Sequence, residues 1–263
     1  MRADFDGRDG KEIYATSRDR NLRELEIDFI ISRIRETAHS ADGAVPVLLD
    51  IGCGNGYTDI RIAEALKADI TGIDFSGEMI AGANYLKERW KDETIVPPVF
   101  KVGDVRTLDW ADGSFDIVLS ERCLLNLPDR ETQYRAIREV RRVLKKGGTY
   151  IMVEGTRDGL RRLNDLRMKV GLEPIPDRAE DNISSLKFEE EEILQFLSGY
   201  FRIVEKQYFG TYYLISRVIH PLLVAPDPPK FDAHINEIAR RIAARIPDCE
   251  KIGHVMGLVL EAV

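Results

Sequence analysis

The stretch from Val47 to Tyr57, VLLDIGCGNGY, constrains the fold of this chain more than any other. It begins with β-prone apolar residues and ends in three glycines at alternate positions, and Thr58 to Ala68 then carries apolar residues at helical spacing. This succession predicts a strand, a glycine turn and a helix, which form the first half of a βαβ unit. Because glycine lacks a Cβ atom, the turn can be tight and a ligand can approach its backbone closely.

The spacing of the glycines separates two kinds of nucleotide site. A dinucleotide fold uses G-x-G-x-x-G, with the pyrophosphate at the helix N-terminus. Here Gly52, Gly54 and Gly56 form G-x-G-x-G behind Asp50, whose carboxylate would repel a pyrophosphate but tolerate an ammonium or sulfonium group. This D-x-G-x-G-x-G resembles the first motif of the class I S-adenosylmethionine-dependent methyltransferases. On this motif alone, a glycine turn that serves only packing remains an alternative.

Later stretches extend the resemblance over about residues 45–155. They are G-D-V at 103–105, D-G-S-F-D-x-V from Asp112, and V-L-K-K-G-G from Val143, which is followed by a strand. The resemblance implies an α/β fold with a seven-stranded, mostly parallel sheet of order 3-2-1-4-5-7-6, in which strand 7 is antiparallel. Helices are expected on both faces, with a helical cover inserted after strands 5 and 6.

The periodicity of the chain gives approximate bounds for the elements. Strands are expected at 47–49, 69–75, 98–105, 115–120, 149–154, 201–209 and 254–263. Helices are expected at 11–37, 58–68, 76–91, 129–145, 157–170, 188–197 and 231–246. Ser76 and Asp129 precede two of the helices as N-caps, and Gly147 with Gly148 is expected to end the helix that Asp129 begins.

The resemblance also implies the residues that hold the cofactor, S-adenosylmethionine. Asp74, at the tip of the second strand, would accept hydrogen bonds from both ribose hydroxyls, and Asp104 would accept from the adenine amino group. Phe75 and Met79 would flank the adenine, although a core role suits Met79 equally. The complete predicted cofactor set is Asp50, Gly52, Cys53, Gly54, Asn55, Asp74, Phe75, Ser76, Met79, Gly103, Asp104, Val105, Ser120 and Tyr14.

Residues just beyond the fourth strand are expected to face the ligand crevice and to carry the chemistry. A neutral alcohol acceptor needs its proton removed during methyl transfer. Glu121 is the first candidate for this base by its position, and His220 is the second because histidine titrates near neutral pH. For a lone histidine such as His220, a structural role is the alternative.

Three further residues are candidates for binding the acceptor. Arg122 could hold an anionic group through a bidentate contact, or it could instead form a salt bridge with Glu154 or another acid of the crevice. Asn126 and Arg157 are weaker candidates of the same kind. The carboxylate set of the magnesium-dependent catechol-type enzymes is not evident, so no metal is expected.

The chain is expected to form a single domain, 1–263, with helical additions. Residues 1–40 would form an N-terminal lid, from which Tyr14, Arg18 and Arg20 could reach the cofactor carboxylate, unless they are solvated surface residues. The insertions 156–186 and 210–250 would cover the acceptor site, because insertions of such length at a sheet edge are usually functional. The alternative for these insertions is a contact in a homodimer.

The amino-acid composition indicates which partners and which cellular compartment are expected. A net charge of −7 and a pI near 5.3 argue against nucleic acid as the main partner. The three cysteines form no C-x-x-C pair, which fits a reducing cytosol, and no stretch is long and apolar enough for insertion into a membrane. A cytoplasmic enzyme acting on small molecules is therefore expected.

The leading hypothesis is an S-adenosylmethionine-dependent methyltransferase that acts on an oxygen of a sugar or secondary-metabolite acceptor. The chain has no [D/N]-P-P-[Y/F] after the fourth strand, which argues against methylation of amino groups on nucleic-acid bases. Two alternatives are a nicotinamide-dependent Rossmann oxidoreductase, which the glycine spacing disfavours, and a non-catalytic partner subunit that keeps the cofactor pocket.

Overall fold

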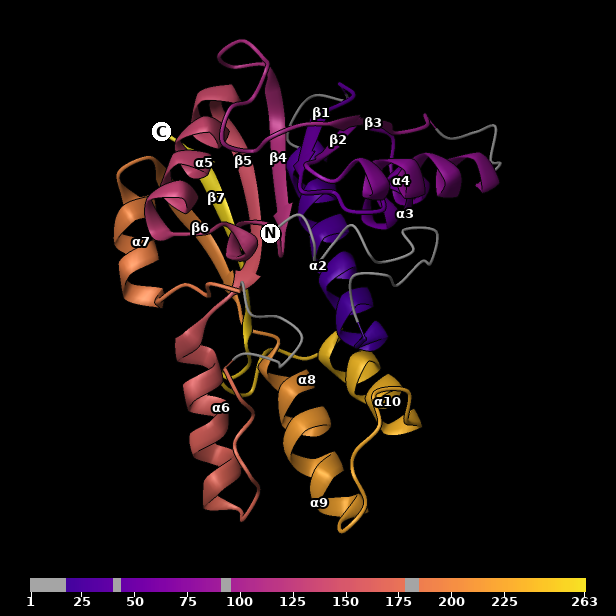
Figure 1. Ribbon diagram of the computed structural model, residues 1–263, viewed down its shortest axis with the longest axis vertical. Helices are drawn as coiled ribbons and strands as arrows, with labels where there is room; N and C mark the ends of the chain where they lie inside the picture. The colour runs from indigo at the N-terminus through magenta and orange to yellow at the C-terminus, as the bar shows by residue number, and fades with distance from the viewer. Residues whose placement is uncertain (1–17, 40–43, 91–95, 178–184) are drawn as a thin grey trace.

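The computed structural model describes residues 18–39, 44–90, 96–177 and 185–263. Within these ranges seven strands form one sheet in the order β3-β2-β1-β4-β5-β7-β6 (Figure 1). The strands are β1 Val47–Ile51, β2 Asp69–Asp74, β3 Val99–Val102, β4 Phe115–Glu121, β5 Leu144–Gly155, β6 Phe201–Gln207 and β7 Val255–Ala262. Strands β1 to β5 pair in parallel, whereas β7 is antiparallel to both β5 and β6. The predicted sheet order and the direction of the seventh strand are confirmed.

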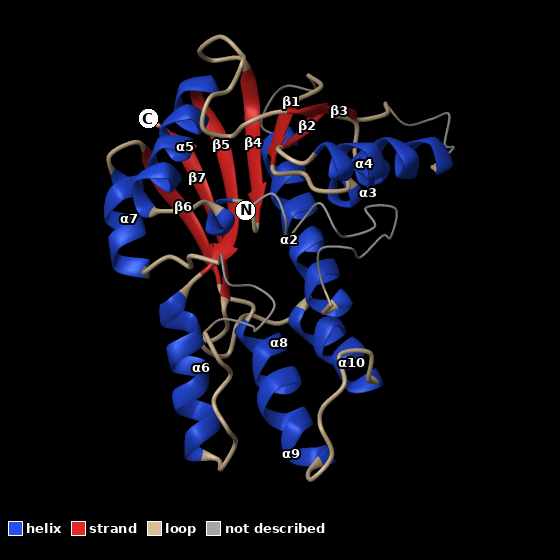
Figure 2. Ribbon diagram, in the orientation of Figure 1, coloured by secondary structure: helices blue, strands red, loops and turns tan. Residues whose placement is uncertain are grey.

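Helices cover both faces of the sheet, as Figure 2 shows. They are α2 Arg20–His39, α3 Tyr57–Ala65, α4 Gly77–Arg89, α5 Arg130–Val143 and α7 Glu190–Ser198. Helices α2 and α3 share one apolar core with the sheet, and α5 and α7 share another on the opposite face. Strands buried on both faces need apolar side chains pointing both ways, which explains the continuous apolar run of β1.

The remaining helices form a lobe beyond the carboxyl ends of the parallel strands (Figure 1). They are α6 Arg157–Lys169, α8 Gly210–Leu214, the π-helical turn η2 Ile215–Ile219, α9 His220–Val224 and α10 His234–Ala243; a 3₁₀ turn, η1 Leu124–Asn126, follows β4. The segments α8, η2 and α9 follow one another directly, with α8 nearest the sheet and α9 farthest from it. None of the described helices combines the length and the hydropathy that crossing a bilayer requires.

The predicted end of the helix 129–145 is wrong. Helix α5 ends at Val143 rather than continuing through Lys145 to a glycine terminus, because Leu144 already pairs with Phe115 of β4. The pairing is then interrupted and resumes at Thr149, so the glycines lie within an irregular stretch of the strand and not at a helix terminus. Pairing with a distant strand outweighs the helical pattern of the local sequence at this point.

Candidate active site

The three glycines after β1 adopt a backbone that other residues rarely tolerate. Their φ angles are +77° at Gly52, +55° at Gly54 and +71° at Gly56, all in the left-handed region. A Cβ atom on Gly52 would lie 2.3 Å from the sulfur of Cys123, which follows β4. The loop can therefore reach the segment after β4 only with glycine at this position.

Asp74 closes this loop against the tip of β2. Its carboxylate accepts hydrogen bonds from the N–H groups of Gly54 at 2.9 Å and Ser76 at 2.8 Å. Ser76 is the N-cap of α4, as predicted, and accepts from the N–H of Met79. Phe75 beside them is 50% exposed, so an apolar ring and an oriented carboxylate lie at one edge.

Several predicted cofactor residues are instead deep in the protein. Met79, Cys53 and Asn55 are buried, so their side chains form part of the packing beneath the loop. Ser120 is buried too, and its hydroxyl shares a 2.8 Å hydrogen bond with the hydroxyl of Tyr150. Contact with a ligand at these positions would have to involve the backbone or the edge of a side chain.

The tip of β3 lies next to that of β2. The N–H of Gly103 donates to the carbonyl of Asp74 at 3.0 Å, which holds the two tips together. Asp104 binds the guanidinium of Arg106 through both carboxylate oxygens, and these hydrogen bonds lower the pKa of Asp104. Val105 is buried behind this pair. Tyr14, the remaining residue of the predicted set, lies outside the described residues.

A layer of buried acids lies between the sheet and helices α2 and α3. Asp50 near the end of β1 and Asp59 in the first turn of α3 are 2% and 0% exposed and interact electrostatically with each other. Burial raises the pKa of Asp59 to about 8 and also raises that of Asp50. Glu121 joins this layer: it accepts from the hydroxyl of Thr58 at 2.6 Å and lies 3.8 Å from Arg23.

Arg122, the residue after β4, forms an ion pair, as the alternative drawn from the sequence allowed, but with an acid that the sequence did not indicate. Its backbone has φ +52°, and its guanidinium donates to Glu26 of α2 at 2.5 Å. Glu26 is fully buried, and burial raises its pKa to about 7 although Arg122 opposes the shift. The partner of Arg122 is therefore Glu26 and not Glu154.

Glu154 of β5 stabilises the turn after β4 through hydrogen bonds to its backbone. Its carboxylate accepts from the N–H groups of Cys123 at 3.1 Å, Leu124 at 2.9 Å and Leu125 at 3.2 Å. Asn126 donates to the carbonyl of Arg122 at 2.8 Å and so stabilises the same turn. The predicted binding residue Asn126 thus has a local structural contact in this structure.

The helix segment α8–η2 joins the site from the lobe. Tyr212 donates to Asp19, the residue before α2, at 2.6 Å, and Arg217 forms an ion pair with the same carboxylate. Tyr213 is fully buried, and its hydroxyl has no hydrogen-bond partner among the described residues. Its electrostatic neighbours are led by Glu26 and Arg122, so the hydroxyl faces their ion pair.

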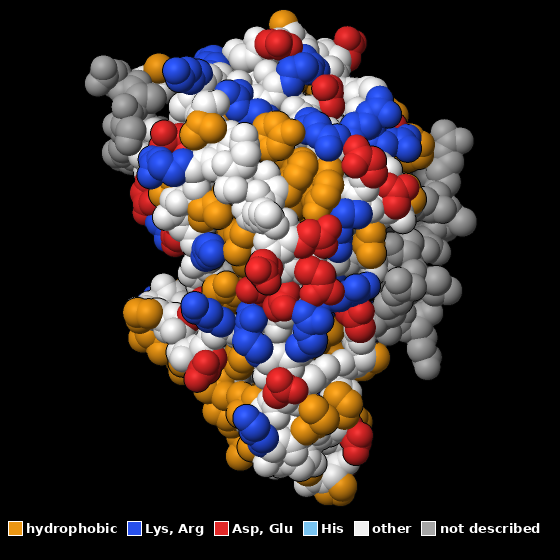
Figure 3. All heavy atoms as spheres, turned by 90° about the vertical axis from the view of Figure 1, so that its left-hand side faces the viewer, with side chains coloured by type: hydrophobic (Ala, Val, Ile, Leu, Met, Phe, Trp, Pro, Cys, Tyr) orange, Lys and Arg blue, Asp and Glu red, His pale blue; other side chains and the backbone are white. Residues whose placement is uncertain are grey.

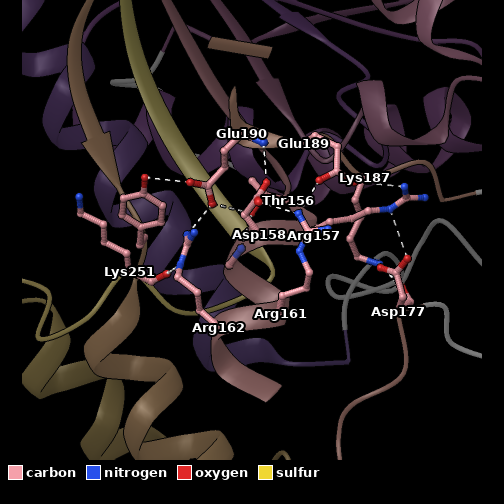
Figure 4. A network of polar contacts seen from close by, with 12 residues as sticks. Thr156, Arg157, Asp158, Arg161, Arg162, Asp177, Lys187, Glu189, Glu190 and Lys251 are labelled. Atoms are coloured by element: carbon pink, nitrogen blue, oxygen red, sulfur yellow. Dashed lines mark hydrogen bonds and ion pairs between the residues drawn. The ribbon is translucent and has the colours of Figure 1, made fainter. Parts of the chain in front are cut away.

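His220 and Arg157 lie apart from this cluster. His220 opens α9, which follows η2 and lies farther from the sheet than α8 with Tyr213 (Figure 1), and His220 is buried. Arg157 opens α6 and forms ion pairs with Glu189 at 3.3 Å and Asp177 at 3.4 Å (Figure 4). The face on the α6 and α7 side carries acidic side chains above basic ones across its middle (Figure 3). Arg157 therefore belongs to a salt-bridge network near the surface.

The residues present fit an adenosyl sulfonium better than a diphosphate. An orientated carboxylate, Asp74, and a half-exposed ring, Phe75, lie at the sheet edge where a nucleoside would be held. Behind the loop, Asp50 Oδ1 and both oxygens of Asp59 have no hydrogen-bond donor among the described residues. This excess of buried acid favours a cationic ligand and opposes an anionic one.

Three residues of this arrangement, Glu26, Asp59 and Tyr213, were not named from the sequence, and Glu154 was named only as a possible partner of Arg122. A signal existed for Glu26, which lies four residues from both Leu22 and Ile30 in the apolar stripe of its helix. An acid within such a stripe needs a buried partner. The others carried no such signal, because an acid in a first helical turn and a tyrosine in an apolar run are ordinary.

Comparisons with known proteins agree with this geometry. Residues 49–152 match the family model described as "Methyltransferase domain". The chain is 40% identical over 101 residues to 27-O-demethylrifamycin SV methyltransferase of Amycolatopsis mediterranei, an alignment covering 38% of this chain and 35% of that protein. It is 37% identical over 106 residues to ajmaline N-methyltransferase of Rauvolfia serpentina, covering 40% and 35% respectively. The chain thus spans about a third of the length of these relatives.

A solved structure extends the similarity to most of the chain. Magnesium protoporphyrin IX methyltransferase from Synechocystis PCC 6803, determined with bound SAH, superposes with a TM-score of 0.58. The alignment covers 92% of this chain and 86% of that structure at 16% identity. At this level of identity the likeness concerns the fold.

Proposed function

Because the chain belongs to the class I S-adenosylmethionine-dependent methyltransferases, we propose that it methylates an oxygen atom of a neutral small molecule of the sugar or secondary-metabolite kind. The observation that carries the proposal is the loop of Gly52, Gly54 and Gly56 fastened to Asp74, backed by the acids Asp50 and Asp59. The chemistry of that donor set suits a nucleoside with a positive charge. Bound there, the cofactor supplies an electrophilic methyl group and departs as a neutral thioether.

The pairing of the two arginines near the site with acids argues against an anionic acceptor and supports an uncharged one. The guanidinium of Arg122 is matched by Glu26, and that of Arg23 lies 3.8 Å from Glu121. Neither cation is left over for an anionic acceptor, so the earlier hypothesis that Arg122 binds an anion loses its main support. A neutral hydroxyl forming hydrogen bonds is easier to bury in such surroundings than a second carboxylate.

An acceptor of this kind needs a base. We assign this role to Glu26, with Glu121 as the alternative, since each has one carboxylate oxygen without a hydrogen-bond partner among the described residues. The raised pKa of Glu26 lies near the working pH, where general-base catalysis is most effective. Tyr213 faces the same ion pair and would orient the acceptor through its hydroxyl. His220, farther along the helix, is the weakest of the candidates.

The remaining contribution of the protein is alignment. Methyl transfer requires the acceptor atom, the methyl carbon and the sulfur in line, in a site that excludes water. We propose that residues 156–186 and 210–250 cover the acceptor side, since their helices lie beyond the carboxyl ends of the parallel strands (Figure 1). Three other expectations remain predictions: a homodimer contact through these insertions, a cytoplasmic location, and the absence of nucleic-acid partners.

A ligand screen by thermal shift tests the proposal. We expect S-adenosylmethionine and S-adenosylhomocysteine to raise the melting temperature, and NAD or NADP to leave it unchanged. Stabilisation by NAD without stabilisation by S-adenosylhomocysteine would instead identify an oxidoreductase.

Transfer itself needs a second assay. Radiolabelled S-adenosylmethionine is incubated with panels of sugars, phenols, amines and carboxylic acids, and label in the extracted products is counted. We expect transfer to neutral hydroxyl compounds. Label only in amines or carboxylates would contradict the assignment of the acceptor, and cofactor binding without any transfer would favour the non-catalytic partner subunit.

A further inference from the structure

Asp59 and Asp50 form a buried carboxyl pair that the proposed chemistry does not yet use. Asp50 is the penultimate residue of β1 and Asp59 lies in the first turn of α3, so both are fixed by regular structure. Two carboxyl groups buried as neighbours favour a proton on one of them, because two adjacent buried negative charges are costly. Asp50 Oδ1 and both oxygens of Asp59 have no hydrogen-bond partner among the described residues.

Packing holds the two carboxyl groups together. A Cβ atom on Gly72 of β2 would lie 2.9 Å from Oδ2 of Asp59, so the absence of a side chain there gives the carboxylate its space. Asp59 is 0% exposed and Asp50 is 2% exposed, so bulk solvent cannot solvate a charge on either carboxylate. The glycine loop begins two residues after Asp50, so the pair lies directly behind the candidate cofactor site.

The charged groups that face the pair come from two directions. Glu121 reaches it from β4 and Arg23 from α2. Arg23 is the cation among these described neighbours, and it also donates to Thr58, which in turn binds Glu121. One cation therefore faces several acids, and its charge is offset by Glu121.

We propose that Asp59 is a charge-compensating residue: it gives up its proton when a sulfonium cofactor binds and regains one when methyl transfer removes the positive charge. This rests on the proposed function. Burying a single negative charge is costly, and a neighbouring cation lowers that cost, so ionised Asp59 suits S-adenosylmethionine and protonated Asp59 suits S-adenosylhomocysteine. Because Asp50 lies two residues before Gly52, the pair is placed to respond to a charge bound at the glycine loop.

The step balances in atoms and charge. The methyl carbon–sulfur bond breaks with its electron pair staying on sulfur, and a carbon–oxygen bond forms from a lone pair of the acceptor oxygen. The acceptor loses its hydroxyl proton to the base. This is the one proton that the buried acids gain as a group, at the step in which the site loses the sulfonium charge. One proton is released per turnover, at the binding of the next S-adenosylmethionine.

Burial supports the proposal because it brings the ionisation of Asp59 close to neutral pH. It raises the pKa of Asp59 to about 8, so this carboxyl is partly protonated near neutral pH and a nearby charge can change its state. An acid titrating at its ordinary value would be ionised in both complexes and would exchange no proton.

Isothermal titration calorimetry of the full chain tests this directly. S-adenosylmethionine and S-adenosylhomocysteine are titrated at pH 7.5 in phosphate, HEPES and Tris, whose different ionisation enthalpies give the protons exchanged on binding. The measured quantity is the difference in proton release between the two ligands. We expect this difference to be larger by about one proton in the wild type than in Asp59→Asn, because the ligands' own amino groups contribute equally to both proteins.

Controls separate the role of Asp59 from general damage. Asp28→Asn removes a half-buried carboxyl of α2 outside this layer and should keep the wild-type difference. If Asp59→Asn does not fold, Asp50→Asn removes the other half of the pair and should also abolish the difference. The wild-type ratio of the two affinities should in addition change with pH, by up to about tenfold per unit below the pKa of the pair.

Two outcomes would overturn the inference: the same proton difference in the wild type and in Asp59→Asn, or a ratio of affinities independent of pH between 6.5 and 8.5. A protein that binds neither ligand would contradict the proposed function instead, so the two failures can be told apart.

Discussion

Asp74 is the residue whose position and hydrogen bonds best fit its predicted role in binding the ribose. It ends β2, and two backbone N–H groups from the glycine loop and the start of α4 fix its carboxylate. A carboxylate held in this way is already oriented toward neighbouring hydroxyls before a ligand arrives. Charged hydrogen bonds of this kind contribute more to affinity than neutral ones.

Replacing Asp74 with alanine is expected to weaken S-adenosylhomocysteine binding by roughly 1–3 kcal/mol, or about 5- to 150-fold in Kd. Calorimetric titration measures the change. Asp69→Ala, at the exposed start of the same strand, is the matched control and should bind normally. Unchanged binding by Asp74→Ala would remove its assignment to the ribose.

Glu26 and Glu121 are two candidate bases that differ in their contacts. Glu26 binds Arg122, whereas Glu121 binds the hydroxyl of Thr58. Once an acceptor is known, we expect Glu26→Gln to lower kcat by roughly 10²- to 10⁴-fold, the usual contribution of a general base. The wild-type rate should rise with pH through about 7, and this dependence should be absent from the variant.

The comparison with Glu121→Gln decides between the two bases. A variant that loses both rate and pH dependence identifies the base, while the other variant should bind and react with smaller changes. Equal, small losses in both variants would mean that the acceptor needs no base from this pair.

At the scale of elements, the junction between α2 and the α8–η2 segment joins the lobe to the sheet domain. Asp19, just before α2, binds Tyr212 and Arg217, and it is almost completely buried. A second link, from Asp28 to Arg240 of α10 at 3.6 Å, is only partly buried. Buried pairs lose more than exposed ones when a partner is removed, because an uncompensated charge remains.

Asp19→Ala is therefore expected to reduce the free energy of unfolding by about 3 kcal/mol and to increase hydrogen exchange in 210–224. Asp28→Ala, the matched control, should change it by less than about 1 kcal/mol. Denaturant titration and exchange followed by mass spectrometry provide the two measurements. Equal effects of the two substitutions would mean that the junction depends on packing and not on the buried ion pair.

At the scale of the whole molecule, buried acids make stability depend on pH in an unusual direction. Burial raises the pKa of Glu154 to about 7, although the three backbone N–H groups that it accepts from oppose the shift. The folded chain then keeps a proton that the unfolded chain releases at lower pH. This contribution to stability is fully present below about pH 4.5 and is lost as pH rises through 7.

The free energy of unfolding of the wild type should consequently fall between pH 5 and pH 8, with a share from Glu154 on the order of 3 kcal/mol. Urea titrations at each pH measure this slope, and Glu154→Gln should flatten it. Glu139→Gln is a suitable control, because Arg142 lowers the pKa of Glu139 and it does not titrate in this range. A Glu154→Gln slope identical to that of the wild type would contradict the account.

Much of the architecture follows from local sequence. The glycines at 52, 54 and 56 adopt left-handed backbone angles, Ser76 and Asp129 cap the helices that they precede, and short apolar runs mark the buried strands. The sheet order came from the resemblance that these motifs carry, and it was confirmed. These features depend on neighbours along the chain, which is why they can be read from the sequence.

The charge pairing of the candidate site depends instead on segments that are distant in sequence. Arg122 and Glu26 are 96 residues apart, and Tyr213 faces their ion pair from the far end of the chain. No periodicity records which buried acid meets which cation, because burial and proximity are set only when helices pack on the sheet. The sequence by itself determined where a cofactor loop lies. Tertiary packing decided that Arg122 is paired with Glu26 and that Asp50 and Asp59 are buried as neighbours, since only desolvation makes those charges costly enough to matter.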